Sequence, residues 1–155
     1  MIQQFLIMAP LSELAYWPDD DAEDYLVHPN FQSIMDVLNL QIPFHDIYEY
    51  ALEQPVHTGH VLKYVLRDTP GTYIIIDSYQ DPLDQLGMVR FGWSCGDHFE
   101  ELQKLSRKLY DECEDKVFYQ EGQTVLYKLS RPENYPNIIR HGERVFHQEL
   151  KVYPL

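Results

Sequence analysis

The stretch RFGWSCGDHFEELQKLSRKLYDECED (90–115) contains the one long helix that the sequence predicts. Apolar side chains recur within it at steps of three and four residues, at Phe99, Leu102, Leu105, Leu109 and Cys113. This spacing places them on one face of a helix, and charged residues fill the opposite face. We therefore expect an amphipathic helix over residues 97–114, packed on a core and capped by Ser94 or Asp97.

The C-terminal end of this helix departs from the usual charge pattern. Four acids, Asp111, Glu112, Glu114 and Asp115, stand where the free carbonyl groups of a helix already create a partial negative charge. Each carboxylate there costs about 0.3–1 kcal/mol at low salt. Because local rules are often broken at functional sites, these acids are candidate partner-binding residues. An ordinary solvated helix end is the alternative interpretation.

Short strands and helices are expected on either side of the long helix. Apolar and β-branched runs predict strands at residues 3–9, 61–68, 72–80, 87–94, 116–120, 124–130 and 143–153. Helical spacing predicts two shorter helices at residues 28–40 and 43–52. The sequence thus predicts a single α+β domain over residues 1–155. Its mostly antiparallel sheet has about six or seven strands, with one long and two shorter helices packed on one face.

The net charge of −13 is unevenly distributed along the chain. Residues 1–62 contain ten acids and no Lys or Arg, whereas residues 63–155 hold all twelve bases together with fifteen acids. A field of this sign repels nucleic acids and anionic membranes and attracts basic partners. Acidity that serves solubility alone is the alternative interpretation; it fits the total charge well but the uneven distribution less well.

The sequence also gives expectations about the cellular compartment. Its apolar runs are shorter than the ~18 residues of a membrane span, and MIQQFLIMA (1–9) lacks the basic start of a signal peptide. Cys95 and Cys113 lie at opposite ends of the predicted helix, about 27 Å apart at ~1.5 Å per residue. That separation is too large for a disulfide between them. Two unpaired thiols without a signal peptide predict a reducing, cytoplasmic location.

Cys95 is the candidate nucleophile if the protein is an enzyme. A thiol at a helix N-terminus ionises more easily, and His98 or His60 could act as its base. The segment SCGDHF (94–99) resembles the Asn-Cys-x-His-Phe element of lecithin:retinol-acyltransferase-like enzymes, with one inserted residue and Ser94 in place of Asn. The resemblance implies a cysteine-dependent hydrolase or acyltransferase.

A second set of side chains has the chemistry of metal ligands. His45 and Glu49 share one face of a predicted helix, and His57 and His60 follow shortly after it. Imidazole and carboxylate groups can bind Zn or Fe. Pro55 breaks the helix between the two halves, and no HExxH spacing is present, so a solvated acidic face is the alternative. Because no phosphate-binding loop or other cofactor motif is found, we expect no cofactor.

The third constellation is an aromatic pair followed by acids, namely Tyr16, Trp17, Asp19, Asp20, Asp21 and Asp24. Aromatic anchors ringed by charge are typical of binding hot spots, although a core position for Trp17 is the alternative. Small acidic proteins that inhibit basic nuclease toxins combine charge steering with buried aromatic anchors. We therefore expect a binding protein that neutralises a basic protein partner, most concretely a bacterial immunity protein or toxin inhibitor. The Cys95 enzyme is the alternative function.

Overall fold

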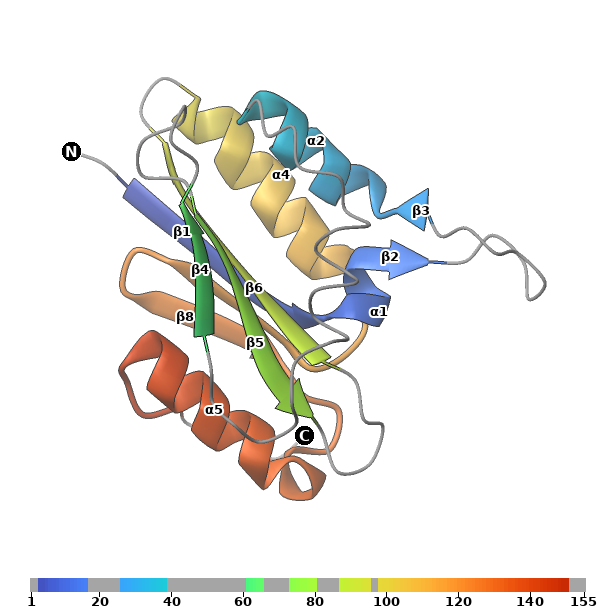
Figure 1. The fold of residues 1–155 in the computed structure, drawn as a ribbon, viewed down its shortest axis with the longest axis vertical. Helices are drawn as coiled ribbons and strands as arrows, with labels where there is room; N and C mark the ends of the chain where they lie inside the picture. Colours follow the sequence, from blue (N-terminus) through green and yellow to red (C-terminus); the bar gives the residue numbers. More distant parts are fainter. Residues whose placement is uncertain are drawn as a thin grey trace.

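The main feature of the fold is an antiparallel sheet (Figure 1). The computed structural model describes residues 3–16, 26–38, 61–65, 73–80, 87–95 and 98–150. Its strands are β1 (Gln3–Pro10), β4 (Val61–Val65), β5 (Tyr73–Gln80), β6 (Gly87–Cys95), β7 (Val117–Glu121) and β8 (Thr124–Lys128). They are hydrogen-bonded in the order β4-β5-β6-β1-β7-β8, and every neighbouring pair is antiparallel. A short ladder also joins β2 (Ala15–Tyr16) to β3 (Leu26–Val27).

Helices pack on this sheet, so the predicted α+β class is confirmed. They are α1 (Leu11–Leu14), α2 (Pro29–Val37), α4 (Phe99–Glu112) and α5 (Pro136–Phe146), with a 3₁₀ turn η1 (Pro132–Asn134). The predicted long helix is present as α4, two residues shorter at each end. Its N-cap is His98, whose side chain makes no capping hydrogen bond, while Ser94 belongs to β6. None of the helices in the described ranges has the length and apolar character needed to span a bilayer.

The sheet is covered on both faces, which corrects the expectation that all helices lie on one face. Successive side chains of a strand point to opposite faces, and β1 is apolar on both. Phe5 and Ile7 join the core formed with α2 and α4, whereas Met8 joins a second core formed with α5. Figure 1 shows α2 and α4 side by side and α5 apart from them. The central strands are therefore buried from both sides, as continuous apolar runs require.

The helix α5 replaces a strand that the sequence predicted at residues 143–153. That prediction was wrong, because residues 143–146 form the last turn of α5. Buried residues of α5 recur at the helical period, at Ile138, His141, Gly142, Val145 and Phe146. Pro136 occupies the first turn of the helix, where a proline is favourable because its missing N–H is not needed there. His147 then ends the helix with a left-handed φ of 55°.

Gly142 lets α5 approach the sheet closely. A Cβ atom at this position would lie 3.0 Å from Cε1 of Phe118 on β7 and 2.9 Å from Cδ1 of Leu150. Both distances are shorter than ordinary van der Waals contacts, so a larger residue would force the helix or the two side chains to move. The close packing of α5 on β7 thus depends on the absence of a side chain here.

Candidate functional site

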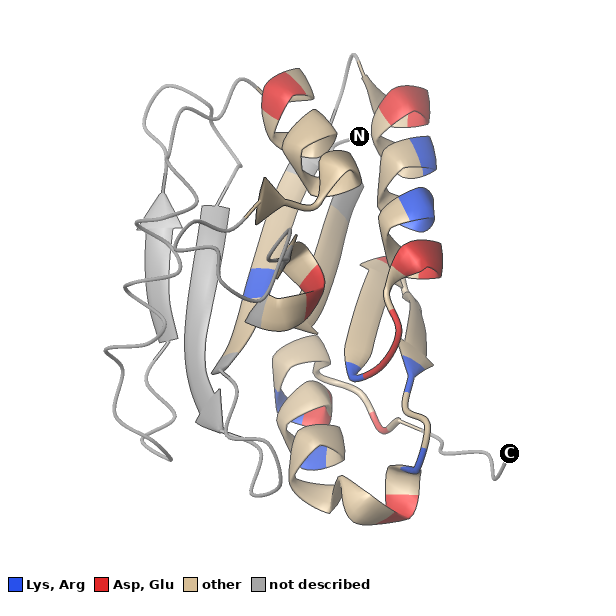
Figure 2. Cartoon of the chain, turned by 90° about the vertical axis from the view of Figure 1, so that its right-hand side faces the viewer, with Lys and Arg blue, Asp and Glu red and all other residues tan. Residues whose placement is uncertain are grey.

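The acidic C-terminal end of α4 is the sequence-predicted feature that the structure describes in most detail. Figure 2 shows acids in the first turn of α4, bases in its middle turns and acids again at its C-terminal end. The base that such an end favours comes from β8 instead of from the helix. Lys128 Nζ donates to the carbonyl oxygens of Tyr110, Asp111 and Cys113 at 2.6, 2.9 and 3.1 Å. The partial negative charge of the helix end is therefore compensated by a cation from another element.

Two of the four predicted partner-binding acids at this end hold the fold together. Glu112 Oε2 accepts a hydrogen bond from Asn30 Nδ2 at 2.7 Å and lies 3.3 Å from His28 Nε2. His28 Nδ1 in turn accepts from the backbone N–H of Asn30 at the N-terminus of α2. Asp115 accepts from the backbone N–H and the hydroxyl of Ser130, at 2.8 and 3.0 Å. Glu112 thus ties α4 to α2, and Asp115 fixes the segment that follows β8.

The other two acids, Asp111 and Glu114, project into solvent. Both residues are exposed, and neither carboxylate has a hydrogen-bond or ion-pair partner among the residues that the structure describes. The backbone N–H groups of Glu114 and Asp115 donate to the carboxylate of Glu13 from α1, at 2.9 and 3.3 Å. The main chain here is therefore held in place, while the two side chains stay available to a partner.

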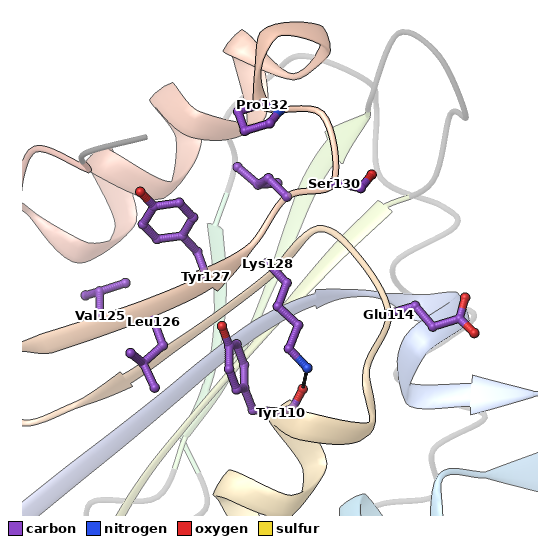
Figure 3. Close-up of a pocket in the computed structure, with 9 residues that line it drawn as sticks. Tyr110, Glu114, Val125, Leu126, Tyr127, Lys128, Ser130 and Pro132 are labelled. Carbon is purple, nitrogen blue, oxygen red and sulfur yellow. Dashed lines mark hydrogen bonds between the residues drawn. The ribbon is translucent and has the colours of Figure 1, made fainter. Parts of the chain in front are cut away.

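A groove runs beside this helix end along β8. It has a volume of about 550 Å³ and is lined by Tyr110, Glu114, Val125, Leu126, Tyr127, Lys128, Leu129, Ser130 and Pro132. Figure 3 shows Tyr110, Leu126 and Lys128 on the same side of β8, with Val125 and Tyr127 pointing to the other side. Burial raises the pKa of Tyr110 to about 12, so its ring is a neutral, apolar wall. Lys128 Nζ lies 4.6 Å from the centre of this ring.

A cluster of polar side chains joins α4 to β7. Glu121 accepts hydrogen bonds from Gln103 Nε2 at 2.5 Å, Tyr119 Oη at 2.9 Å and Arg107 Nε at 3.1 Å. Partial burial by itself raises the pKa of Glu121, but hydrogen bonds from Arg107, Gln103 and Tyr119 outweigh it and lower the pKa. Burial raises the pKa of Tyr119. Because every member of the cluster has an internal partner, the cluster ties α4 to β7.

The residues of the enzyme hypothesis are only partly described. Cys95 is the last residue of β6, where its backbone pairs with Gln3, and its side chain is outside the described part. His98 is exposed, and its Nδ1 lies 3.7 Å from Glu101 Oε2 on the same helix. His60 lies outside the described residues. The other thiol, Cys113, is buried, and burial raises its pKa to about 12, so it has no nucleophilic character near neutral pH.

Several further predicted site residues are also outside the description. These are Trp17, Asp19, Asp20, Asp21 and Asp24 of the N-terminal acidic run, the side chain of Tyr16, and the metal candidates His45, Glu49 and His57. Within the ranges that are described, no three His, Cys, Asp or Glu side chains are grouped as metal ligands would be. The N-terminal acidic run and the metal site therefore stay predictions.

Sequence reasoning missed the groove and the role of Lys128. A signal was present, because alternation along Thr124–Lys128 places Leu126 and Lys128 on one face of the strand. What the sequence could not show is that this face lies against the end of α4. In comparisons with protein-family models, with curated proteins and with solved structures, no match to this chain was found.

Proposed function

We propose that this chain is an acidic cytoplasmic protein that binds and neutralises a basic protein partner, most concretely as a bacterial immunity protein or toxin inhibitor. The observation that carries the proposal is the distribution of charge. Ten acids and no Lys or Arg stand in residues 1–62, within a net charge of −13. Solubility needs net charge but does not need it concentrated in one part of the chain. Attraction of a basic surface does benefit from such concentration, because it orients the encounter.

The C-terminal end of α4 supports the same proposal and indicates which of its acids would contact the partner. Asp111 and Glu114 are exposed, and their carboxylates make no hydrogen bond or close ion pair within the described residues. Glu112 and Asp115 already accept hydrogen bonds from Asn30 and Ser130, so they contribute less to a partner surface. Within this group of four, the proposal therefore assigns partner contact to Asp111 and Glu114.

The test is the kinetics of association, measured by surface plasmon resonance with the basic partner recovered by affinity capture from the source cells. Steering acts over a Debye length of about 8 Å at 0.15 M salt, so the on-rate should fall steeply as salt rises above that value. Replacing Asp19, Asp20, Asp21 and Asp24 by Asn should lower the on-rate and leave the fold intact. Trp17→Ala should instead raise the dissociation rate, at a cost of about 2 kcal/mol if Trp17 is an anchor.

A matched variant separates local steering from total charge. This control variant changes the net charge by the same amount as the N-terminal substitutions, but in the C-terminal half of the chain. It carries Gln in place of Glu100, Glu101, Glu143 and Glu149. The N-terminal set should slow association more than this control set. An on-rate that responds neither to salt nor to the N-terminal substitutions would refute the proposal and leave the acidity to solubility alone.

A further inference from the structure

The outer edge of β8 has the features of a strand-docking site. β8 is the last strand in the order of the described sheet. A two-residue turn joins it to β7, with Glu121 paired to Thr124 and a positive φ of 62° at Gly122. Across such a turn the closing pair exchanges both backbone hydrogen bonds, and the pattern then alternates along the ladder. It follows that Val125, a residue that lines the groove, directs its backbone N–H and C=O away from β7, at the outer edge of the sheet.

The apolar part of the groove is exposed to an unusual degree for this protein. Leu126 has 40% of its surface exposed, and Leu126 and Leu26 are the two large hydrophobic residues exposed in the described part of the chain. The Tyr110 ring lies on the same side of β8 as Leu126 (Figure 3). An apolar side chain placed between them would be removed from water, which favours binding in proportion to the buried area.

The charged groups around the groove favour a basic occupant. Lys128, the cation of the groove wall, is directed at three carbonyl oxygens of α4, so its charge is compensated within the protein. Glu114 lines the groove at one end and Asp111 lies on the adjacent turn of α4, both exposed. Next to Pro132, Glu133 is exposed beside the exposed Arg131. Of the two charged residues that line the groove, Glu114 is the exposed one and Lys128 is already compensated, so an approaching chain meets negative charge there.

From these three observations we infer that the groove along β8 receives an extended basic segment of the protein partner, paired with the edge of β8 at Val125. The inference rests on the proposed function and adds the place and manner of contact. Backbone pairing supplies affinity, while alternate side chains of the segment provide specificity, an aliphatic one against Leu126 and Tyr110 and a basic one toward Glu114. A second copy of this chain is a poorer occupant, because it would bring together two molecules of charge −13.

The test uses a synthetic probe and the intact chain. A fluorescein-labelled peptide of sequence Lys-Val-Lys-Val-Lys-Val-Lys is titrated with the protein at low salt, and binding is followed by fluorescence anisotropy. The same sequence built from alternating L- and D-residues keeps its composition and charge but cannot form a regular strand. It should bind about tenfold more weakly or worse, a difference typical of losing one or two good contacts. Binding of the all-L peptide should also slow hydrogen exchange of the Val125 amide.

Two matched pairs of substitutions locate the site. Two double variants change the net charge equally at opposite ends of α4. The first combines Asp111→Asn with Glu114→Gln, and the second combines Glu100→Gln with Glu101→Gln. The first pair should weaken peptide binding about fivefold more than the second, as expected for one or two lost charge contacts. Leu126→Lys, at an exposed position, should abolish binding by placing a like charge in the groove.

The outcomes distinguish this inference from the proposed function. If the two acid pairs weaken peptide binding equally and binding remains sensitive to salt, the groove is not the binding site, and the proposed charge steering still holds. Binding that is indifferent to salt and to both acid pairs would overturn both. A dimer seen by sedimentation that Leu126→Lys dissociates would also overturn the inference, since a second copy would then occupy the edge.

Discussion

At the residue scale, Lys128 explains why α4 tolerates acids at its C-terminal end. The sequence predicts a cost there, yet the ammonium group satisfies three carbonyl oxygens at once. Lys128→Met should therefore lower the free energy of unfolding by about 2 kcal/mol, because partly buried acceptors lose a charged donor. Urea denaturation measures the loss. Lys108→Met, an exposed position on α4, is the control and should change stability little, whereas equal losses in the two variants would contradict the capping role.

Cys113 gives a second prediction at this scale. Burial raises the pKa of its thiol to about 12, so almost no thiolate is present at pH 8. In a Cys95→Ser background, the remaining thiol should react with iodoacetamide only after the protein is unfolded. Mass spectrometry after alkylation in buffer and in denaturant measures the fraction of Cys113 that has reacted. Rapid alkylation of the native protein at pH 8 would show that Cys113 is accessible and would contradict the packing around it.

At the element scale, Glu121 fastens β7 to α4. Its pKa is lowered from the ordinary value of 4.5 by hydrogen bonds that outweigh burial. Because the folded pKa lies below the unfolded one, the carboxylate stabilises the fold above about pH 4.5, and this contribution is lost as the pH falls through the folded pKa. Glu121→Gln should thus cost about 1–2 kcal/mol at pH 7.

The pH dependence separates this interaction from a packing defect. The difference in unfolding free energy between the wild type and Glu121→Gln should shrink as urea titrations are repeated at progressively lower pH. Glu133→Gln, at an exposed position of η1, provides the control and should leave stability nearly unchanged throughout. If the unfolding free energy of Glu121→Gln stays below that of the wild type by the same amount down to pH 3, the loss of stability comes from altered packing and not from the charge.

The elements also show how far local sequence reasoning reaches. Phe99 to Leu109 repeat with a strong helical period, so α4 could be predicted within two residues at each end. In α5, the helical signal starts directly after Pro136, within a stretch whose prolines and asparagines favour a loop. The sequence pattern therefore predicted a strand beginning at residue 143, although residues 143–146 belong to α5. The groove could not be predicted at all, because it depends on the approach of β8 to the end of α4.

At the scale of the whole molecule, the two-faced sheet follows from β1 and β7, whose side chains are buried toward both sides. A sequence pattern can show that a strand is apolar on both faces, but it cannot say which helix covers which face. That assignment depends on the directions of the connections between elements. The distribution of charge, by contrast, is readable from the sequence directly, which is why the function proposed here rests on it.

The net charge of −13 also predicts how the stability of the protein responds to salt. Like charges repel more strongly in the compact state than in the unfolded chain, and added salt screens this repulsion. Raising the salt concentration from about 0.01 to 0.5 M should therefore raise the melting temperature by a few degrees, since 1 kcal/mol corresponds to about 2–4 °C at this size.

The N-terminal acids should account for a large part of this salt response. With Asp19, Asp20, Asp21 and Asp24 replaced by Asn, the melting temperature should be higher at low salt and should rise less as salt is added. The control with Gln at Glu100, Glu101, Glu143 and Glu149 removes the same charge where bases are interspersed, so its salt response should stay closer to that of the wild type. Circular dichroism melts at two salt concentrations measure both effects. Identical responses in the two variants would mean that repulsion follows total charge, and the N-terminal acids would then form no distinct field that could steer a partner.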